Sequence, residues 1–403
     1  MYRRGHGCRW HFQFLIYGIL IALRLRAAGF CVNTTTSLQQ RRRRPLRNAV
    51  NNLDALRLSA RKIKKMQTHV YLSIAGENRI AIYTLDVSSG GIEFQENIGV
   101  SGSPGPLALS PCGNYLYAGL RSSREIASFR IDEETKHLSI LRTVQLDADT
   151  CYIATDKTGS FLLSAYYGAG KVTVHTIGDD KTVQGETLQT VETDIHAHCI
   201  ETDASNRFAF VPHTVPRNAI YQFQFDEGTG TLTQNPVGNL NPGAPIGPRH
   251  FCFHPNKPIL YASNEQGSSV SAYTLQEGGE HPGILVDLQK DLSTLPADFD
   301  ADNTCAQIHI DPQGKFLYVS NRGHNSIAEF AIDEKNGKLS AVGHQLTEPT
   351  PRVFNIDATG TLLFVGGQGS GKLATYRINQ ENGTLAPIGN YAVGESPMWV
   401  LFV

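Results

Sequence analysis

The sequence lacks the short patterns that identify many hydrolases and redox proteins. It contains no HExxH, GxSxG or CxxC pattern, so it supports neither zinc nor serine-nucleophile hydrolysis and no thiol–disulfide centre. No long stretch shows the periodicity of an amphipathic helix. The cysteines number 7, an odd count, and we interpret them as free, mostly buried thiols of a reducing compartment.

Basic residues are scarce over most of the chain. The first 65 residues hold 15 of the 36 Lys and Arg residues but only one acid, Asp54. The rest of the chain therefore carries 21 basic and 36 acidic side chains, a formal charge of −15 that the overall net charge of −1 conceals. Such an acidic body argues against nucleic-acid binding, which depends on neutralising phosphates.

The N-terminal segment differs from the body in composition. Residues 12–23 form an apolar stretch after three arginines, which resembles a signal peptide but is too short for a comfortable transmembrane helix. The basic stretch 41–45 has no periodicity and is predicted to be disordered. Either this segment directs the protein to a compartment, or translation starts at Met66. We expect a basic extension over 1–65 and one domain over 66–403.

One hairpin recurs seven times from residue 82 onward. It consists of an alternating strand, a turn rich in acidic residues, Asn or Gly, and a short strand. Successive turns lie 46, 46, 48, 50, 57 and 46 residues apart, and the interval of 57 indicates an insertion around 291–303. The residues that mark the turns are Asp86, Asp132, Gly178, Asp226, Gln276, Asp333 and Asn379.

A second hairpin precedes each copy except the first, as in IHIDPQGKFLYVS (308–320). Four short strands in about 45 residues are typical of a propeller blade. The first copy lacks its innermost strand, because HVYLS (69–73) corresponds to the second, and SPMWVLFV (396–403) can supply it. The sequence therefore predicts an all-β fold, a seven-bladed β-propeller with four antiparallel strands per blade and one blade closed by both termini.

Hairpin geometry predicts which residues surround one mouth of the central channel. The end of each second strand and the start of each first strand meet there. The opposite rim carries Asp-x-x-Gly turns and is interpreted as turn chemistry alone. The second-strand ends are Ala75, Arg121, Tyr167, His213, Glu265, Arg322 and Gln368. The first-strand starts are His196, His198, Arg249, His250 and Arg352, with Tyr152 and Met398 in similar places.

These positions carry four arginines, several histidines and one carboxylate. Arginines suit a small anionic ligand, and an acid–base group can assist its reaction. A structural alternative stands beside this, because Arg249, Glu265 and Arg322 could form an ionic network that locks blades together. His213 and His250 could equally be packed core histidines. We favour His196 over His198 as a catalytic group, since it lies nearer the mouth.

Four segments carry a family resemblance. They are GPRHFCFHPNKPILYASNEQGSSV (247–270), IHIDPQGKFLYVSNRGHNSIAEFAID (308–333), TPRVFNIDATGTLLFVGGQ (350–368) and YAVGESPMWV (391–400). The chain resembles the lactonase family of seven-bladed propellers, which includes propeller-type bacterial 6-phosphogluconolactonases and fungal carboxy-muconate cyclase. The resemblance covers essentially all of 66–403. One segment departs from it, since residues 208–218 place His213 where many relatives have Asp-Leu-Gly.

The resemblance implies an active site containing His196, Arg249, Glu265 and Arg322. It implies hydrolysis of 6-phospho-D-glucono-1,5-lactone to 6-phospho-D-gluconate, a step of the pentose phosphate pathway. Arg249 and Arg322 would hold the phosphate and polarise the carbonyl, while Glu265 or His196 activates water. The predicted catalytic residues are His196, Glu265 and Arg322. The predicted substrate-binding residues are Arg249, His198, His250, Arg352, Gln368 and Arg121.

Two other functions remain open at this stage. A cycloisomerase or lactonase acting on a carboxylated muconolactone would need the same arginines and one proton donor. A non-enzymatic propeller would bind a partner on its rim, although the varied, ionisable rim does not favour this. We expect no cofactor, no metal, no nucleic acid and no membrane contact for 66–403. The predicted ligand is a small anionic sugar lactone, and no oligomer interface is readable. We expect a cytoplasmic protein, with export left open by the apolar N-terminal stretch.

Overall fold

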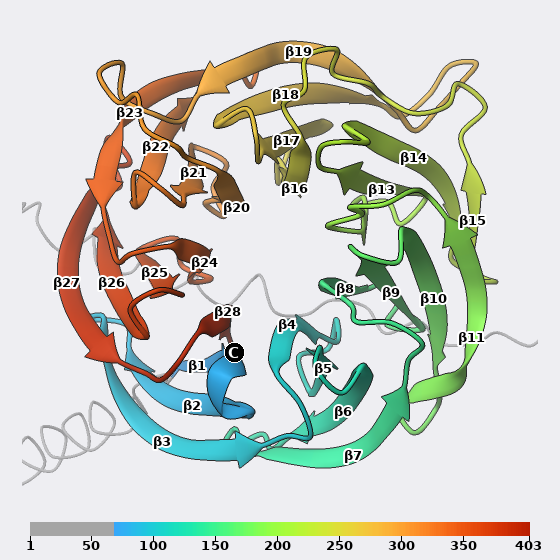
Figure 1. Ribbon diagram of the computed structural model, residues 1–403, viewed down its shortest axis with the longest axis vertical. Coiled ribbons are helices and arrows are strands. Elements are labelled where there is room, and N and C mark those ends of the chain that lie inside the picture. The colour runs from blue at the N-terminus through green and yellow to red at the C-terminus, as the bar shows by residue number, and fades with distance from the viewer. Residues whose placement is uncertain (1–67) are drawn as a thin grey trace, which may run out of the picture. The chain divides into compact units, whose positions relative to one another are not determined.

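A computed structural model describes residues 68–403, which form seven four-stranded antiparallel sheets arranged around a common axis (Figure 1). This confirms the predicted all-β, seven-bladed propeller. The expectations for the apolar stretch 12–23, the basic stretch 41–45 and a start at Met66 lie outside the described residues. No helix among the described residues is long and apolar enough to cross a membrane.

The blades follow one another in chain order, each running from its innermost to its outermost strand. Blade 1 consists of β28 (Pro397–Phe402), β1 (Thr68–Ile74), β2 (Arg79–Asp86) and β3 (Gly91–Gly99). Blade 2 consists of β4 (Pro104–Leu109), β5 (Tyr115–Leu120), β6 (Glu125–Ile131) and β7 (Leu138–Gln145). Blade 3 consists of β8 (Tyr152–Thr155), β9 (Phe161–Tyr166), β10 (Lys171–Ile177) and β11 (Val183–Glu192). Blade 4 consists of β12 (Glu201–Thr202), β13 (Phe208–His213), β14 (Ala219–Asp226) and β15 (Thr231–Gln234). Blade 5 consists of β16 (Pro248–Phe253), β17 (Ile259–Asn264), β18 (Ser269–Gln276) and β19 (Ile284–Ser293). Blade 6 consists of β20 (Cys305–Ile310), β21 (Phe316–Asn321), β22 (Ser326–Ile332) and β23 (Leu339–Leu346). Blade 7 consists of β24 (Pro351–Ile356), β25 (Leu362–Gly367), β26 (Lys372–Ile378) and β27 (Leu385–Ala392). A short 3-10 turn, η1 (Ala75–Glu77), joins β1 to β2.

Blade 1 is built from both ends of the described chain, as predicted. The C-terminal strand β28 pairs antiparallel with β1, for example Leu72 with Val400. Beyond the strand ends, the backbone N–H groups of His69 and Val403 each donate to the other's carbonyl, at 3.0 and 2.8 Å. The innermost strand that the first repeat lacks is thus supplied by the last residues, so the ring contains no gap between first and last blades.

Neighbouring blades are joined by tyrosines on the second strands. Their rings are fully buried between sheets, and each hydroxyl donates to a turn carbonyl of the next blade. Tyr261 donates to the Gly337 carbonyl at 2.7 Å, and Tyr318 donates to the Gly383 carbonyl at 2.8 Å. Tyr71 and Tyr117 make the equivalent bonds in blades 1 and 2. The aromatic residue of the repeat therefore contributes buried apolar area together with a satisfied hydroxyl.

The inner edge of blade 4 differs from the sequence-based interpretation. The segment DIHAHC (194–199) was expected to form a strand, yet β12 is only two residues long and Ala197 makes an isolated bridge to His213. Asp194 and His196 have φ values of +100° and +69°, which interrupt the extended backbone before the bridge. The segment nevertheless lies along β13, because the His198 N–H donates to the Pro212 carbonyl at 3.0 Å.

Two further expectations can be compared with the fold. The insertion expected around 291–303 corresponds to the end of β19 and the long connection 294–304 that leads to β20. The five cysteines of the described residues are free thiols, which agrees with the interpretation of an unpaired set. Cys151, Cys199 and Cys305 are buried, whereas Cys112 is exposed.

Candidate active site

The first strands begin at the channel mouth with a recurring irregularity. In β16, Pro248 pairs with Asn264 and His250 pairs with Ser263, so that Arg249 is an extra residue between them. The same register shift occurs at the starts of β4, β20, β24 and β28. Such a bulge changes the direction of a side chain without ending the strand. The residues at this register position, from blade 1 to blade 7, are Met398, Gly105, Cys151, His198, Arg249, Ala306 and Arg352.

The second strands end at the same mouth and supply a second ring of residues. The residue after the last paired position is Glu265 in blade 5 and Arg322 in blade 6. In blade 4 the last paired residue is His213, which is in register with Asn264, so that Thr214 rather than His213 occupies the rim position. The turn between β13 and β14 is one residue longer than the corresponding turn between β17 and β18.

His213 is a packed core residue. It is fully buried, its Nδ1 lies 3.1 Å from the Val211 carbonyl oxygen, and its Nε2 lies 3.0 Å from Thr193 Oγ1. Its ring packs against Tyr221. Burial lowers the pKa of His213 to about 4, so the imidazole is neutral. These contacts satisfy both ring nitrogens and agree with the structural alternative considered from the sequence.

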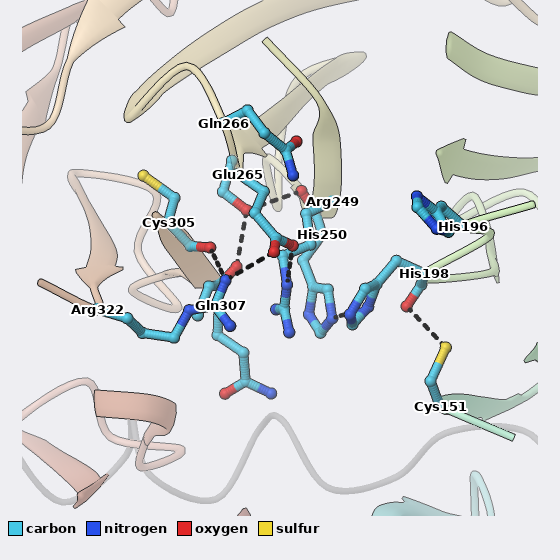
Figure 2. A network of polar contacts seen from close by, with 12 residues as sticks. Cys151, His196, His198, Arg249, His250, Glu265, Gln266, Cys305, Gln307 and Arg322 are labelled. Atoms are coloured by element: carbon cyan, nitrogen blue, oxygen red, sulfur yellow. Dashed lines mark hydrogen bonds and ion pairs between the residues drawn. The ribbon is translucent and has the colours of Figure 1, made fainter. Parts of the chain in front are cut away.

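Arg249, Glu265 and Arg322 form one cluster (Figure 2). Arg249 Nε lies 2.8 Å from Glu265 Oε2, and Arg322 Nη2 lies 2.9 Å from Glu265 Oε1. Arg322 Nη2 also donates to the Cys305 carbonyl at 2.9 Å. The Glu265 backbone is held by bonds to Gly247 and Cys305, which fixes its position between blades 5 and 6. One carboxylate therefore holds two guanidinium groups from adjacent blades.

The cluster contains two guanidinium groups but only one carboxylate, so its positive charge exceeds its negative charge. Arg249 is only 2% exposed, and burial, then the charges of Arg352 and Arg322, lower its pKa to about 9. Burial raises the pKa of Glu265, but the guanidinium groups of Arg249 and Arg322 outweigh burial and lower it below its ordinary value. Arg249 Nη1 is buried without a hydrogen-bond partner among the described residues. At neutral pH the cluster is therefore cationic and retains an unused donor.

His198 and His250 form a neutral pair beside this cluster (Figure 2). His250 Nε2 lies 3.2 Å from His198 Nδ1, so one imidazole donates and the other accepts. Burial, followed by the charge of Arg249, lowers both pKa values well below the ordinary histidine range. Burial, assisted by the nearby arginines, thus keeps both imidazoles uncharged.

Arg121 and Arg352 line the same cavity from blades 2 and 7. Arg121 Nη2 pairs with Asp149 Oδ2 at 2.7 Å, while its Nε is buried without a hydrogen-bond partner among the described residues. The half-buried Arg352 makes no ion pair within 4.0 Å among the residues that the structure describes. All seven blades contribute to this narrow cavity, which is lined by Gly105, Pro106, Arg121, Cys151, His198, Arg249, His250, Gln307, Arg352, Val353, Met398 and Trp399.

Two predicted residues lie apart from the others. His196 is not among the residues lining the cavity, and Figure 2 shows it on the far side of His198 from Glu265. Its ring stacks on Tyr167 with centroids 4.2 Å apart, and its Nδ1 lies 2.6 Å from the Val215 carbonyl oxygen. Gln368 donates from Nε2 to Ser396 Oγ at 3.4 Å and is likewise outside the cavity lining. The catalytic role of His196 remains a prediction.

Sequence reasoning missed six residues of the cavity lining, three of which carry polar or aromatic side chains: Cys151, Gln307 and Trp399. Gln307 and Trp399 are in register with His250, so an alignment of the strand starts by pairing would have identified them. Cys151 shares the register position of Arg249, but burial raises its pKa to about 11 despite nearby arginines. A protonated, buried thiol is not an activated nucleophile.

A second cavity opens at the other end of the channel, where the sequence indicated turns alone. It is lined in part by Tyr152, Glu201 and His309, and it shares His250, Gln307 and Trp399 with the first cavity. The Tyr152 hydroxyl donates to Glu201. Among the described residues, no group of three or more His, Cys, Asp or Glu side chains is arranged to hold a metal ion.

Comparisons with known proteins give the family. The family model described as "Lactonase, 7-bladed beta-propeller" matches residues 32–146 and 102–402. A 6-phosphogluconolactonase of Pectobacterium carotovorum subsp. carotovorum is 35% identical over 335 residues, covering 83% of this chain and 98% of the relative. A 6-phosphogluconolactonase of Yersinia pestis is 34% identical with the same coverage. A protein of Lactobacillus plantarum has a similar solved structure, with a TM-score of 0.76, 25% identity and coverage of 84% of this chain and 100% of that one. The chain belongs to the seven-bladed β-propeller lactonase family.

Proposed function

We propose that this protein hydrolyses 6-phospho-D-glucono-1,5-lactone to 6-phospho-D-gluconate. The observation that carries the proposal is the Arg249–Glu265–Arg322 cluster at the channel mouth, where two guanidinium groups share one carboxylate. Full-length relatives that are about one third identical are named 6-phosphogluconolactonases. A cationic, largely buried cluster suits a reaction that develops negative charge on a carbonyl oxygen.

The arginines stabilise the tetrahedral intermediate. Water attacks the lactone carbonyl carbon, and the carbonyl oxygen becomes an oxyanion. Arg249 Nη1 is a buried donor without a partner among the described residues. Arg322 pairs with Glu265, the carboxylate that Arg249 also contacts, and so places a second guanidinium group at the same position. A fixed donor in a site of low dielectric typically contributes about 10²- to 10³-fold to the rate. The bond from the carbonyl carbon to the ring oxygen then breaks.

Glu265 is the general base of the proposed reaction. Its lowered pKa keeps it ionised at neutral pH, so a carboxylate oxygen can accept the proton of the attacking water. That proton passes to the ring oxygen, which leaves as the new hydroxyl, and the product carboxylic acid ionises. His196 is the alternative base, because donation from its Nδ1 to the Val215 carbonyl leaves Nε2 free to accept a proton.

The test is hydrolysis of freshly generated 6-phosphogluconolactone by the full chain, followed against spontaneous ring opening. We expect acceleration that Glu265→Ala and Arg322→Ala both abolish, while circular dichroism shows that the fold is retained. A rate equal to the spontaneous one would refute the proposal, and carboxylated muconolactones would be the next substrates to examine.

A further inference from the structure

The cavity holds more positive than negative charge. Four guanidinium groups reach it or its rim, those of Arg121, Arg249, Arg322 and Arg352. Two carboxylates pair with them: Glu265, which bridges Arg249 and Arg322, and Asp149, which pairs with Arg121. Two positive charges are therefore uncompensated in a part of the chain whose overall charge is strongly negative.

Arg352 is the arginine without a carboxylate. It occupies the bulge position of β24 that Arg249 occupies in β16, so the backbone turns its side chain into the same cavity. Burial, followed by the charges of Arg322 and Arg121, lowers its pKa to about 10, which leaves it protonated at neutral pH. A half-buried cation beside two like charges is unfavourable unless an anion joins it.

Arg121 is the second arginine of this part of the cavity. Its neighbour on β4 is Gly105, and a Cβ atom there would lie 3.0 Å from Arg121 Cδ and 3.2 Å from Cγ. Glycine at this ring position therefore leaves room for the Arg121 side chain to lie over the inner strand. Its buried Nε remains a donor without a partner among the described residues, because Asp149 contacts Nη2.

The two halves of the site thus differ in what occupies their arginines. Arg249 and Arg322 share the carboxylate of Glu265, and Arg121 pairs with the partly exposed Asp149 and keeps its Nε without a hydrogen-bond partner among the described residues. Arg352 pairs with no carboxylate among those residues. We propose that Arg352, together with Arg121, binds the phosphate of the substrate, while the Arg249–Glu265–Arg322 cluster acts on the lactone ring. A phosphate monoester carries a charge of about −1.5 to −2 at neutral pH, opposite in sign to the uncompensated charge of Arg352 and to the remaining positive charge of the neighbouring cluster. This assignment rests on the proposed lactonase function, and it moves the phosphate from Arg249 and Arg322, on blades 5 and 6, to Arg352 and Arg121, on blades 7 and 2.

The experiment compares two lactones and one small anion. Initial rates of the full chain are measured on 6-phosphogluconolactone and on glucono-1,5-lactone, which lacks the phosphate. For Arg352→Gln, the ratio of kcat/KM for the phosphorylated over the unphosphorylated lactone should fall about 10- to 100-fold, mainly through KM. Arg352→Lys, which keeps the charge, should recover part of the ratio. Arg322→Gln should lower both rates and leave the ratio within about threefold.

Binding of inorganic phosphate provides a readout independent of turnover. Calorimetric titration should show binding by the unmodified chain that Arg352→Gln and Arg121→Gln each weaken about tenfold or more. Arg130→Gln is the matched control, since Arg130 is exposed on β6 near the opposite end of blade 2.

The outcomes separate the two proposals. An unchanged ratio for Arg352→Gln, or phosphate binding that Arg352→Gln leaves intact, overturns the assignment of the phosphate site and leaves the lactonase function standing. If neither lactone is hydrolysed faster than it opens spontaneously, the proposed function fails. The phosphate titration of the same variants then still decides whether Arg352 and Arg121 bind that anion.

Discussion

The two ends of the inner strands differ in how much their residues vary from blade to blade. At the end away from the channel mouth, four blades have an aspartate in the turn between the first and second strands. At the mouth, the position after the second strand holds an arginine, a glutamate, a threonine or a glutamine in different blades. Each aspartate accepts two backbone N–H groups at Oδ1, at distances between 2.6 and 3.0 Å. The four are Asp156, Asp203, Asp311 and Asp357. When equivalent positions of different blades hold the same residue type with the same contacts, that residue stabilises the fold. A position whose residue changes from blade to blade is free to take part in binding or catalysis.

The largest expected effect comes from the variable end. Glu265→Gln removes the carboxylate that compensates Arg249 and Arg322, and we expect lactone hydrolysis to fall about 10²- to 10³-fold. Because unpaired buried cations also reduce stability, Glu265→Asp is made alongside to retain the charge. Steady-state rates and thermal unfolding of both variants are measured. Full activity in Glu265→Gln would show that the cluster only locks the blades together.

The repetitive end should behave in the opposite way. Asp311→Ala removes the acceptor of the Gln313, Lys315 and Phe316 N–H groups, which leaves three backbone donors of the turn without this acceptor. We expect a loss of about 2–3 kcal/mol in the free energy of unfolding, measured by urea denaturation. The kcat/KM of the folded variant should stay within about twofold of the unmodified chain. Asp311→Asn, which keeps an acceptor oxygen, should lose less, and a large drop in kcat/KM would remove the distinction between the two ends.

A smaller effect should rank the two histidines of blade 4. His198 lines the cavity and contacts His250, whereas His196 stacks on Tyr167 outside the cavity lining. We expect His198→Asn to lower kcat/KM about tenfold, and more than His196→Asn does. The two variants are compared on the same lactone at the same pH. A larger loss for His196→Asn would restore His196 as the catalytic base.

The smallest effect concerns a buried carboxyl group on the third strand of blade 6, outside the lining of the cavity. Glu329 accepts the Leu385 N–H of the next blade at 2.8 Å, and burial raises its pKa above the ordinary value of 4.5. Because the folded state then binds the proton more tightly than the unfolded state, this group makes stability fall as pH rises from about 4.5 through the raised folded pKa. Glu329→Gln keeps the acceptor and cannot ionise. Its stability relative to the unmodified chain should therefore increase with pH in urea titrations, and a difference that stays constant with pH would contradict this prediction.

Much of the fold could be predicted because repetition makes weak local signals additive. A single strand such as LALS is ambiguous, but seven hairpins at similar spacing are not, and the missing first strand identified β28 as its replacement. The irregular start of blade 4 could not be predicted, since positive φ at Asp194 and His196 depends on contacts with the preceding turn rather than on residue type.

The sequence indicated which residues meet at the channel mouth better than it indicated how they are aligned and paired there. Alternation indicated which strand ends meet, and this placed Arg249, Glu265 and Arg322 at one mouth. It could not reveal the bulge that aligns His198 with Arg249, because an extra residue in one strand shifts the register without changing the hydrophobic pattern. Nor could it show which arginines share the carboxylate, since ion pairing is decided by side-chain positions from different blades.

The pairing of β28 with β1 has a consequence for synthesis of the protein. The last strand brings Met398 and Trp399 into the cavity and supplies the innermost edge of blade 1. A chain emerging from the ribosome therefore carries its first blade incomplete until these residues are made, while blades between them can already pack. Premature termination a few residues before Phe402 would leave β1 with an open edge and the cavity without one wall, so a truncated product would be both inactive and prone to association.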